Sequence, residues 1–109
     1  MIKGKIKGNV WERSTKKHLI SRGFFVVKQG ASLFPDLIAI NRDGKVFFIE
    51  CKSAKNYITS KEKQMLRDMA RQYSISPFVC YPKYGVYSLS PDNFVFQNLD
   101  NVIIDMELL

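Results

Sequence analysis

At 109 residues and 46% hydrophobic content, the chain fits one compact domain spanning residues 1–109, long enough to bury a core without disulfides or structural zinc. No stretch approaches the roughly 18 apolar residues of a membrane span, and the N-terminus lacks the apolar middle of a signal peptide. We therefore expect a soluble, intracellular protein without a membrane partner. Cys51 and Cys80 lie in apolar runs without the spacing of a metal knuckle, and we expect buried thiols.

The net charge of +7 is unevenly distributed along the chain. Residues 1–83 carry 17 basic and 6 acidic groups, a net charge of +11, whereas residues 84–109 carry four acidic groups and no basic ones. Such an asymmetry is typical of proteins that bind nucleic acid, although a solvated charged face gives the same composition.

The first half of the chain predicts one helix and three strands. Asn9 and Glu12 have the spacing of a capping box and Gly23 is a favoured C-terminal residue, so we expect a helix over about residues 10–22. A short strand over residues 24–27 and a loop over 29–32 follow. Two apolar strands, residues 36–40 and 45–52, then flank a hairpin turn at residues 41–44.

The second half predicts a further helix and further strands. Thr59 and Glu62 form a second capping box, and apolar residues at helical spacing continue the helix to Gln72 or Tyr73. Residues 77–81 and 85–89 are predicted strands around a turn at 82–84. The apolar tail, residues 102–109, is either an edge strand or a short helix. Strands with one helix before them and one after them along the chain, and hairpins between, indicate a mixed α/β fold.

The hairpin turn determines which side chains meet across the two central strands. If Gly44 takes the left-handed position of a three-residue loop, Asn41 pairs with Lys45. Counting back from that pair places Asp36 opposite Glu50. Because side chains alternate along a strand, Glu50 and Lys52 share one face.

Two carboxylates opposite each other in a sheet lie about 5 Å apart and repel by roughly 3 kcal/mol at an effective dielectric near 20. A divalent cation between Asp36 and Glu50 reverses the sign of that interaction, and Lys52 is then placed to orient or deprotonate an attacking water. This chemistry suits phosphodiester hydrolysis. The alternative is that Glu50 and Lys52 form the polar face of an amphipathic strand and pair only with each other.

Glu12 has two interpretations. Its position relative to Asn9 predicts a helix cap, whereas its helical spacing with Thr15 and Leu19 predicts an inward-facing carboxylate that binds the metal directly or supports a ligand.

Pro35-Asp36 followed by Glu50-Cys51-Lys52 resembles the PD-(D/E)xK nuclease signature, and the flanking sequence is similar to the archaeal Holliday-junction resolvases. The resemblance implies a restriction-endonuclease-like mixed sheet flanked by helices and a homodimer acting on branched or double-stranded DNA. It also implies Mg²⁺, or alternatively Mn²⁺, held by Asp36, Glu50, the Cys51 backbone carbonyl and Glu12. Lys52 is then catalytic, and Ser32 is the loop serine near the scissile phosphate.

This sequence departs from the resolvase pattern after Ser32, where Leu33-Phe34-Pro35 replaces the usual glycine and basic stretch. The departure bears on junction selectivity and on the role of Ser32. Virus-type replication-repair nucleases of the same superfamily, which act on flaps or other branched DNA, remain an alternative. So do a catalytically inactive DNA-binding module and a purely structural protein.

Basic residues around the signature are candidates for contacts with DNA phosphates, which position a protein without reading sequence. Lys3, Lys5 and Lys7 are expected to form a flexible basic arm. The other candidates are Arg13, Lys28 and Lys55. For the homodimer interface, we expect surplus apolar surface from Phe94, Phe96 and the tail, residues 102–109. The alternative is that the tail completes the core of the monomer.

Overall fold

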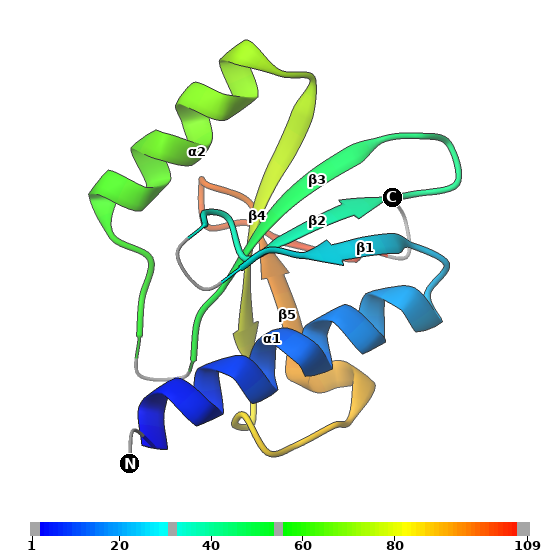
Figure 1. Cartoon of the computed structure of the whole chain (residues 1–109), viewed down its shortest axis with the longest axis vertical. Coiled ribbons are helices and arrows are strands. Elements are labelled where there is room, and N and C mark those ends of the chain that lie inside the picture. Colours follow the sequence, from blue (N-terminus) through cyan, green and yellow to red (C-terminus); the bar gives the residue numbers. More distant parts are fainter. Residues whose placement is uncertain (1–2, 31–32, 54–55, 107–109) are drawn as a thin grey trace.

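The structure is a computed structural model that describes residues 3–30, 33–53 and 56–106, with the backbone alone described for residues 3–8 (Figure 1). Along the chain the helices are α1 (Lys3–Ser21) and α2 (Ser60–Gln72), with a short 3-10 helix at Pro91–Asn93. The strands are β1 (Phe25–Lys28), β2 (Leu37–Ile40), β3 (Val46–Cys51), β4 (Ile75–Pro82), β5 (Phe94–Gln97) and β6 (Ile103–Ile104).

The strands form one six-stranded sheet in sequential order from β1 to β6. The connection through α2 returns the chain to the end of the sheet where β3 begins, so β4 runs parallel to β3. Every other neighbouring pair is antiparallel. The mixed α/β class predicted from the sequence is confirmed. Within the described part of the chain, no helix is long and apolar enough to cross a membrane.

Two apolar clusters cover opposite faces of this sheet. Trp11 and Leu19 of α1 pack in one cluster with Phe47 of β3. Leu66 of α2 packs in the other, against which Phe48 lies. Since neighbouring residues on a strand point to opposite faces, α1 and α2 cover different sides of the sheet. The predicted burial of the thiols holds for Cys80, and Cys51 is partly buried against the α1 side.

The C-terminal end of α1 follows the prediction, but its start does not. Gly23 has φ +94°, and the N–H groups of Gly23 and Phe24 donate to the carbonyls of Ile20 and Leu19, the pattern of a Schellman motif. The helix begins at Lys3, so the predicted capping box at Asn9 is wrong and Glu12 lies inside the helix. The basic arm is also wrong, because the backbone there is helical. Glycine costs a helix only about 1 kcal/mol, so Gly4 and Gly8 do not stop it.

The predicted strand over residues 85–89 is wrong as well. Asn93 is fully buried, and its side-chain amide donates to the carbonyls of Gly85 and Ser88 while its oxygen accepts from the backbone of Tyr84. These bonds fold residues 84–88 into a loop. The alternating apolar residues in this stretch mimic a strand, but Tyr87 lies on the surface.

The C-terminal aromatic residues contribute to the monomer core. Phe96 is buried, and the Phe94 ring stacks on Trp11 with the centroids 4.8 Å apart. The prediction that these two residues supply surplus surface is therefore wrong. In the tail, β6 pairs with β5 as an edge strand and Met106 is buried in the α1-side cluster, whereas Ile103 remains exposed.

Candidate active site

The central hairpin has the register expected from its turn. Asn41 and Lys45 are joined by a backbone hydrogen bond, and Gly44 has φ +80°. The paired residues continue down to Leu37 and Ile49, so the next pair is Asp36 with Glu50. The predicted opposition of these two acids is confirmed.

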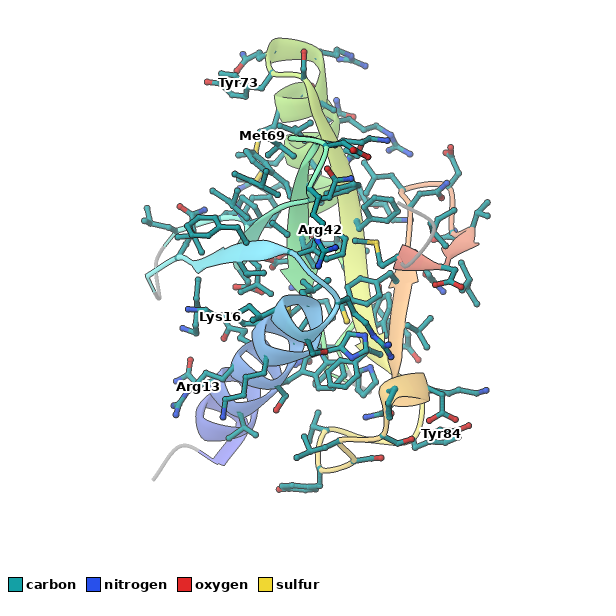
Figure 2. The ribbon with its side chains drawn as sticks, turned by 90° about the vertical axis from the view of Figure 1, so that its right-hand side faces the viewer. Arg13, Lys16, Arg42, Met69, Tyr73 and Tyr84 are labelled. Carbon is teal, nitrogen blue, oxygen red and sulfur yellow. The ribbon has the colours of Figure 1, made fainter. Side chains whose placement is uncertain are left out.

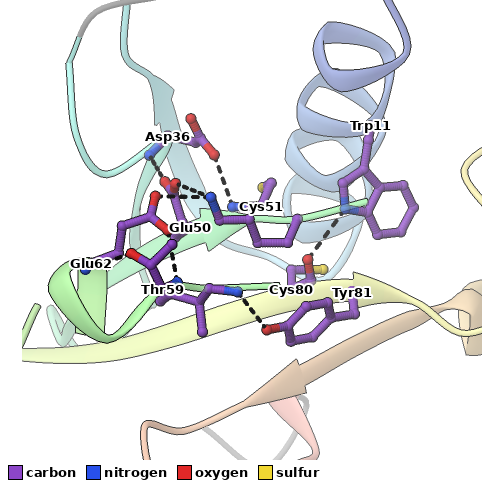
Figure 3. A network of polar contacts seen from close by, with 10 residues as sticks. Trp11, Asp36, Glu50, Cys51, Thr59, Glu62, Cys80 and Tyr81 are labelled. Carbon is purple, nitrogen blue, oxygen red and sulfur yellow. Dashed lines mark hydrogen bonds and ion pairs between the residues drawn. The ribbon is translucent and has the colours of Figure 1, made fainter. Parts of the chain in front are cut away.

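Each of these two carboxylates bonds to the backbone of the opposite strand (Figure 3). Glu50 Oε1 accepts a hydrogen bond from the Asp36 N–H at 3.1 Å, and Asp36 Oδ2 accepts one from the Cys51 N–H at 2.9 Å. Gln29 stabilises the loop before Asp36, because its side-chain amide donates to the Pro35 carbonyl at 2.8 Å. The two acids are thus held close together at one end of β2 and β3.

This crowding shifts the proton affinity of the acids. Burial, followed by the negative charge of Asp36, raises the pKa of Glu50 to about 8, although Lys52 opposes the shift. Burial and the charge of Asp36 also raise the pKa of Glu12 to about 7. Glu12 hydrogen-bonds to Asp36, so α1 does bring its inward-facing carboxylate to this site, as the helical spacing predicted.

Lys52 lies between Glu50 and a third acid that the sequence interpretation assigned only to a helix cap. Its Nζ is 3.4 Å from Glu50 Oε2 and 2.8 Å from Glu62 Oε2. Partial burial lowers the pKa of Lys52, but the hydrogen bond to Glu62 and the charges of both glutamates outweigh that effect and raise it. Lys52 is therefore held as a cation.

Glu62 is held in turn by the start of α2. Its N–H donates to Thr59 Oγ1 and its Oε1 accepts from the Thr59 N–H, each at 3.0 Å, which confirms the second capping box. The other carboxylate oxygen is left for Lys52. Burial alone would raise the pKa of Glu62, but the hydrogen bond from Lys52 and those from Thr59 lower it.

The face of β3 and β4 opposite Lys52 is apolar and packs against α1. The Trp11 indole N–H donates to the Cys80 carbonyl at 3.3 Å, and Thr15 Oγ1 lies 3.9 Å from Cys80 Sγ. Burial raises the pKa of the Cys51 and Cys80 thiols well above the usual range, so both are inert as nucleophiles. Cys51 contributes to the site through its backbone, which lies between Glu50 and Lys52.

The donor chemistry of the site fits a hard divalent cation. Crowded carboxylates repel each other, and a cation that replaces their protons offsets that repulsion. Magnesium typically binds one or two carboxylates and completes its coordination with water. Within the described ranges, no three His, Cys, Asp or Glu side chains surround a common point. Asp36 and Glu50 are therefore the suitable pair, with Glu12 adjacent to Asp36, and water and backbone oxygen would complete the coordination.

Two of the residues predicted to contact DNA lie close to Glu12. Arg13 and Lys28 are near enough to lower the pKa of Glu12. Arg13 projects outward from α1 beside Lys16 (Figure 2). Lys3, Lys5 and Lys7 lie on the first turns of α1, and nothing is described of their side chains. Ser32 and Lys55 lie outside the described residues.

Comparisons with known proteins identify the family and support the fold. The family model described as archaeal Holliday junction resolvase (Hjc) matches residues 3–108. The crossover junction endodeoxyribonuclease Hjc of Methanocaldococcus jannaschii is 29% identical over 102 residues, which are 91% of this chain and 76% of that protein. The solved structure of Archaeoglobus fulgidus Hjc, a Holliday junction resolvase, superposes with a TM-score of 0.67 at 22% identity. This match covers 86% of this chain and 74% of that one.

Proposed function

Because the chain belongs to the archaeal Holliday junction resolvase family, we propose that residues 1–109 form a single nuclease domain that cuts four-way DNA junctions, with Asp36, Glu50 and Lys52 at its centre. The observation that carries this assignment is the cross-strand pair of Asp36 and Glu50 with Lys52 Nζ 3.4 Å from Glu50. The same arrangement disfavours a purely structural role, because neighbouring acids whose pKa values are raised by burial and by each other are typical of functional sites.

Asp36 and Glu50 are the proposed ligands of the metal, assisted by the Cys51 carbonyl and, through Asp36, by Glu12. A bound Mg²⁺ supplies Lewis-acid activation of the phosphate and lowers the pKa of a bound water. Mn²⁺ is the alternative ion. The raised pKa of Glu50 predicts that metal binding releases protons near neutral pH.

Lys52 is proposed to act as a fixed positive charge at the scissile phosphate. Its ion pairs with Glu50 at 3.4 Å and with Glu62 at 2.8 Å support this role over the general-base role considered from sequence. A cation held in place by Glu62 stabilises the charge that develops on the phosphate oxygens without any reorganisation during the reaction.

One cleavage assay tests this function. The purified protein is incubated with four-way-junction, flap, nicked and linear DNA, each with Mg²⁺, with Mn²⁺ and without metal. We expect metal-dependent cleavage with preference for the junction, and none by the matched control Asp36→Asn. A preference for flaps would favour the virus-type nuclease alternative. Binding without cleavage in either metal would favour the inactive DNA-binding module.

The proposed DNA contacts are Arg13 and Lys28 beside Glu12, together with Lys3, Lys5, Lys7 and Lys55. Their support is the net charge of +11 over residues 1–83 and the proximity of Arg13 and Lys28 to the carboxylates. Ser32 remains a proposed contact to the scissile phosphate. We propose an intracellular location, which a DNA substrate supports.

We further propose that the protein is a homodimer, since a junction is resolved by two matched cuts and a closed two-fold pair presents two identical sites. An exposed apolar sheet face supports this proposal. Phe25 and Val27 of β1 are 65% and 44% exposed, and they pair with Ile40 and Ile38 of β2 on the side away from α1.

α2 leaves that face uncovered, because it lies beside β4 and away from β1 (Figure 1). One flank of α2 carries further apolar side chains. Met69 and Tyr73 project from the same side of the helix (Figure 2), and Met65 precedes Met69 by one turn. Several exposed apolar side chains on one side of a small protein favour an interaction site. We therefore place the proposed interface here and not on the C-terminal tail.

A further inference from the structure

A hollow of about 470 Å³ lies on the other flank of α2, next to the catalytic centre. Its wall includes two tyrosines, Tyr57 and Tyr81, with ring centroids 6.3 Å apart and ring planes tilted by 48°. Tyr57 is 75% exposed, which is unusual for a large aromatic side chain that lines a concave surface. The hollow therefore offers an accessible aromatic face.

The rest of the lining is basic and polar. Lys63 and Lys83 contribute positive charge, and among the described residues that line the hollow none is acidic. Gln97 and Asn101 add amide groups, and Asn101 accepts a hydrogen bond from Lys63 Nζ at 3.2 Å. Aromatic rings combined with cations are the chemistry by which proteins hold single-stranded nucleic acid, because bases stack and phosphates pair with the lysines.

The hollow is connected to the catalytic centre through a short segment of chain. Tyr81 Oη accepts a hydrogen bond from the Ile58 N–H at 3.3 Å, and the next residue, Thr59, holds Glu62, which binds Lys52 (Figure 3). β3 and β4 are also parallel, so Lys52 and Tyr81 lie at the same end of the sheet. A DNA strand at Lys52 is thus within reach of the hollow.

We propose that this hollow binds an unstacked nucleotide of the DNA strand that leads away from the cleaved bond, with the base on Tyr57 and its phosphates near Lys63 and Lys83. The inference rests on the proposed junction-cutting function. It assigns to the loop before α2 a role in holding the branch point open.

The test uses a four-way junction carrying 2-aminopurine at the branch point, whose fluorescence reports base stacking. Tyr57→Ala is compared with Tyr57→Phe, which keeps the stacking ring, and with Tyr87→Ala, which removes an equally exposed tyrosine elsewhere on the surface. We expect Tyr57→Ala to weaken junction binding at least about fivefold and to change the fluorescence of the bound junction. Tyr57→Phe and Tyr87→Ala should behave as the wild type.

A second variant tests the charge of the hollow. Lys83→Ala should reduce the slope of log affinity against log salt by about one, because one phosphate contact is lost. Unchanged affinity and fluorescence in Tyr57→Ala, together with an unchanged slope in Lys83→Ala, would overturn the proposal. Wild-type cleavage of the same junction is measured in parallel. If the wild type cuts and these variants match it, the hollow is excluded while the proposed function stands, whereas a wild type that cuts no junction overturns both.

Discussion

The contact between Lys52 and Glu62 predicts that a residue on a helix cap controls the cleavage rate. Their side chains are only 17% and 22% exposed, and the Nζ–Oε2 distance is 2.8 Å. A hydrogen bond to a charged group contributes about 1.5–3 kcal/mol. If Glu62→Ala removes that amount of transition-state stabilisation by Lys52, the variant should cut about ten to a hundred times more slowly, since each 1.4 kcal/mol is about tenfold in rate.

Glu62→Gln separates the charge from the helix cap. Glutamine is accepted at this position of a capping box, so its oxygen can keep the bond to the Thr59 N–H. The other group of the amide is an NH2, which is a donor and cannot accept from Lys52 Nζ, so both the charge and the hydrogen bond to Lys52 are lost while the cap is kept. We expect Glu62→Gln to cut about as slowly as Glu62→Ala in single-turnover cleavage, although it keeps the helix cap. Junction affinity should change little, because the loss affects the transition state more than binding.

The matched control is Thr59→Ala, which breaks the same cap without touching Lys52 and should cost about 0.5–2 kcal/mol of stability. Its cleavage rate should stay near that of the wild type below the unfolding transition. Two results would refute the reasoning: a Thr59→Ala rate as low as that of Glu62→Ala, or a Glu62→Gln rate equal to or above the wild type. The first would assign the effect to stability, and the second would show that Glu62 restrains Lys52.

Five further predictions concern the acids, the charge, the surfaces and the C-terminal tail. Asp36→Asn and Glu50→Gln should abolish cleavage in Mg²⁺ without weakening folding, and a rate near wild type in either would reject the assigned centre. The folded-state pKa of Glu50 is raised from 4.5 to about 8, so the metal-free wild type should lose stability as pH rises across that window. Urea unfolding at both ends of this pH window should show a smaller loss of stability in Glu50→Gln than in the wild type. Junction affinity should fall steeply between roughly 50 and 200 mM salt, and a flat response would argue against phosphate recognition. Phe25→Glu should give a monomer by sedimentation while Ile103→Glu, equally exposed on β6, should not; the reverse would place the interface on the tail. Deleting the residues after Asn101 should lower the unfolding midpoint, because Met106 is buried in the core, and an unchanged midpoint would contradict that role.

The opposition of Asp36 and Glu50 was predictable from sequence because its geometry is local. A three-residue turn with glycine in the left-handed position sets the register of the hairpin, and the register sets which carboxylates face each other. The second capping box was predictable for the same reason, since Thr59 and Glu62 are three residues apart. The functional roles of these residues and of Ser32 remain predictions.

Elements that depend on distant partners were not predictable in this way. The alternation of apolar residues at 85–89 favoured a strand, but the buried side chain of Asn93 organises these residues as a loop. Phe94 and Phe96 looked like surplus apolar surface because their partners on α1 and in the sheet are far away in sequence. The motif at Asn9 and Glu12 predicted a cap, yet the helix continues through it to Lys3.

The sequence by itself determined the hairpin, its opposed acids and the family resemblance, because a turn and a strand period fix positions over a few residues. Only the tertiary structure decided that Glu62 of α2 binds Lys52, that Glu12 of α1 reaches Asp36, and that an apolar face and a basic aromatic hollow lie on opposite flanks of α2. These contacts join segments that share no local pattern. They arise when α1 and α2 pack their apolar sides onto the two faces of the sheet.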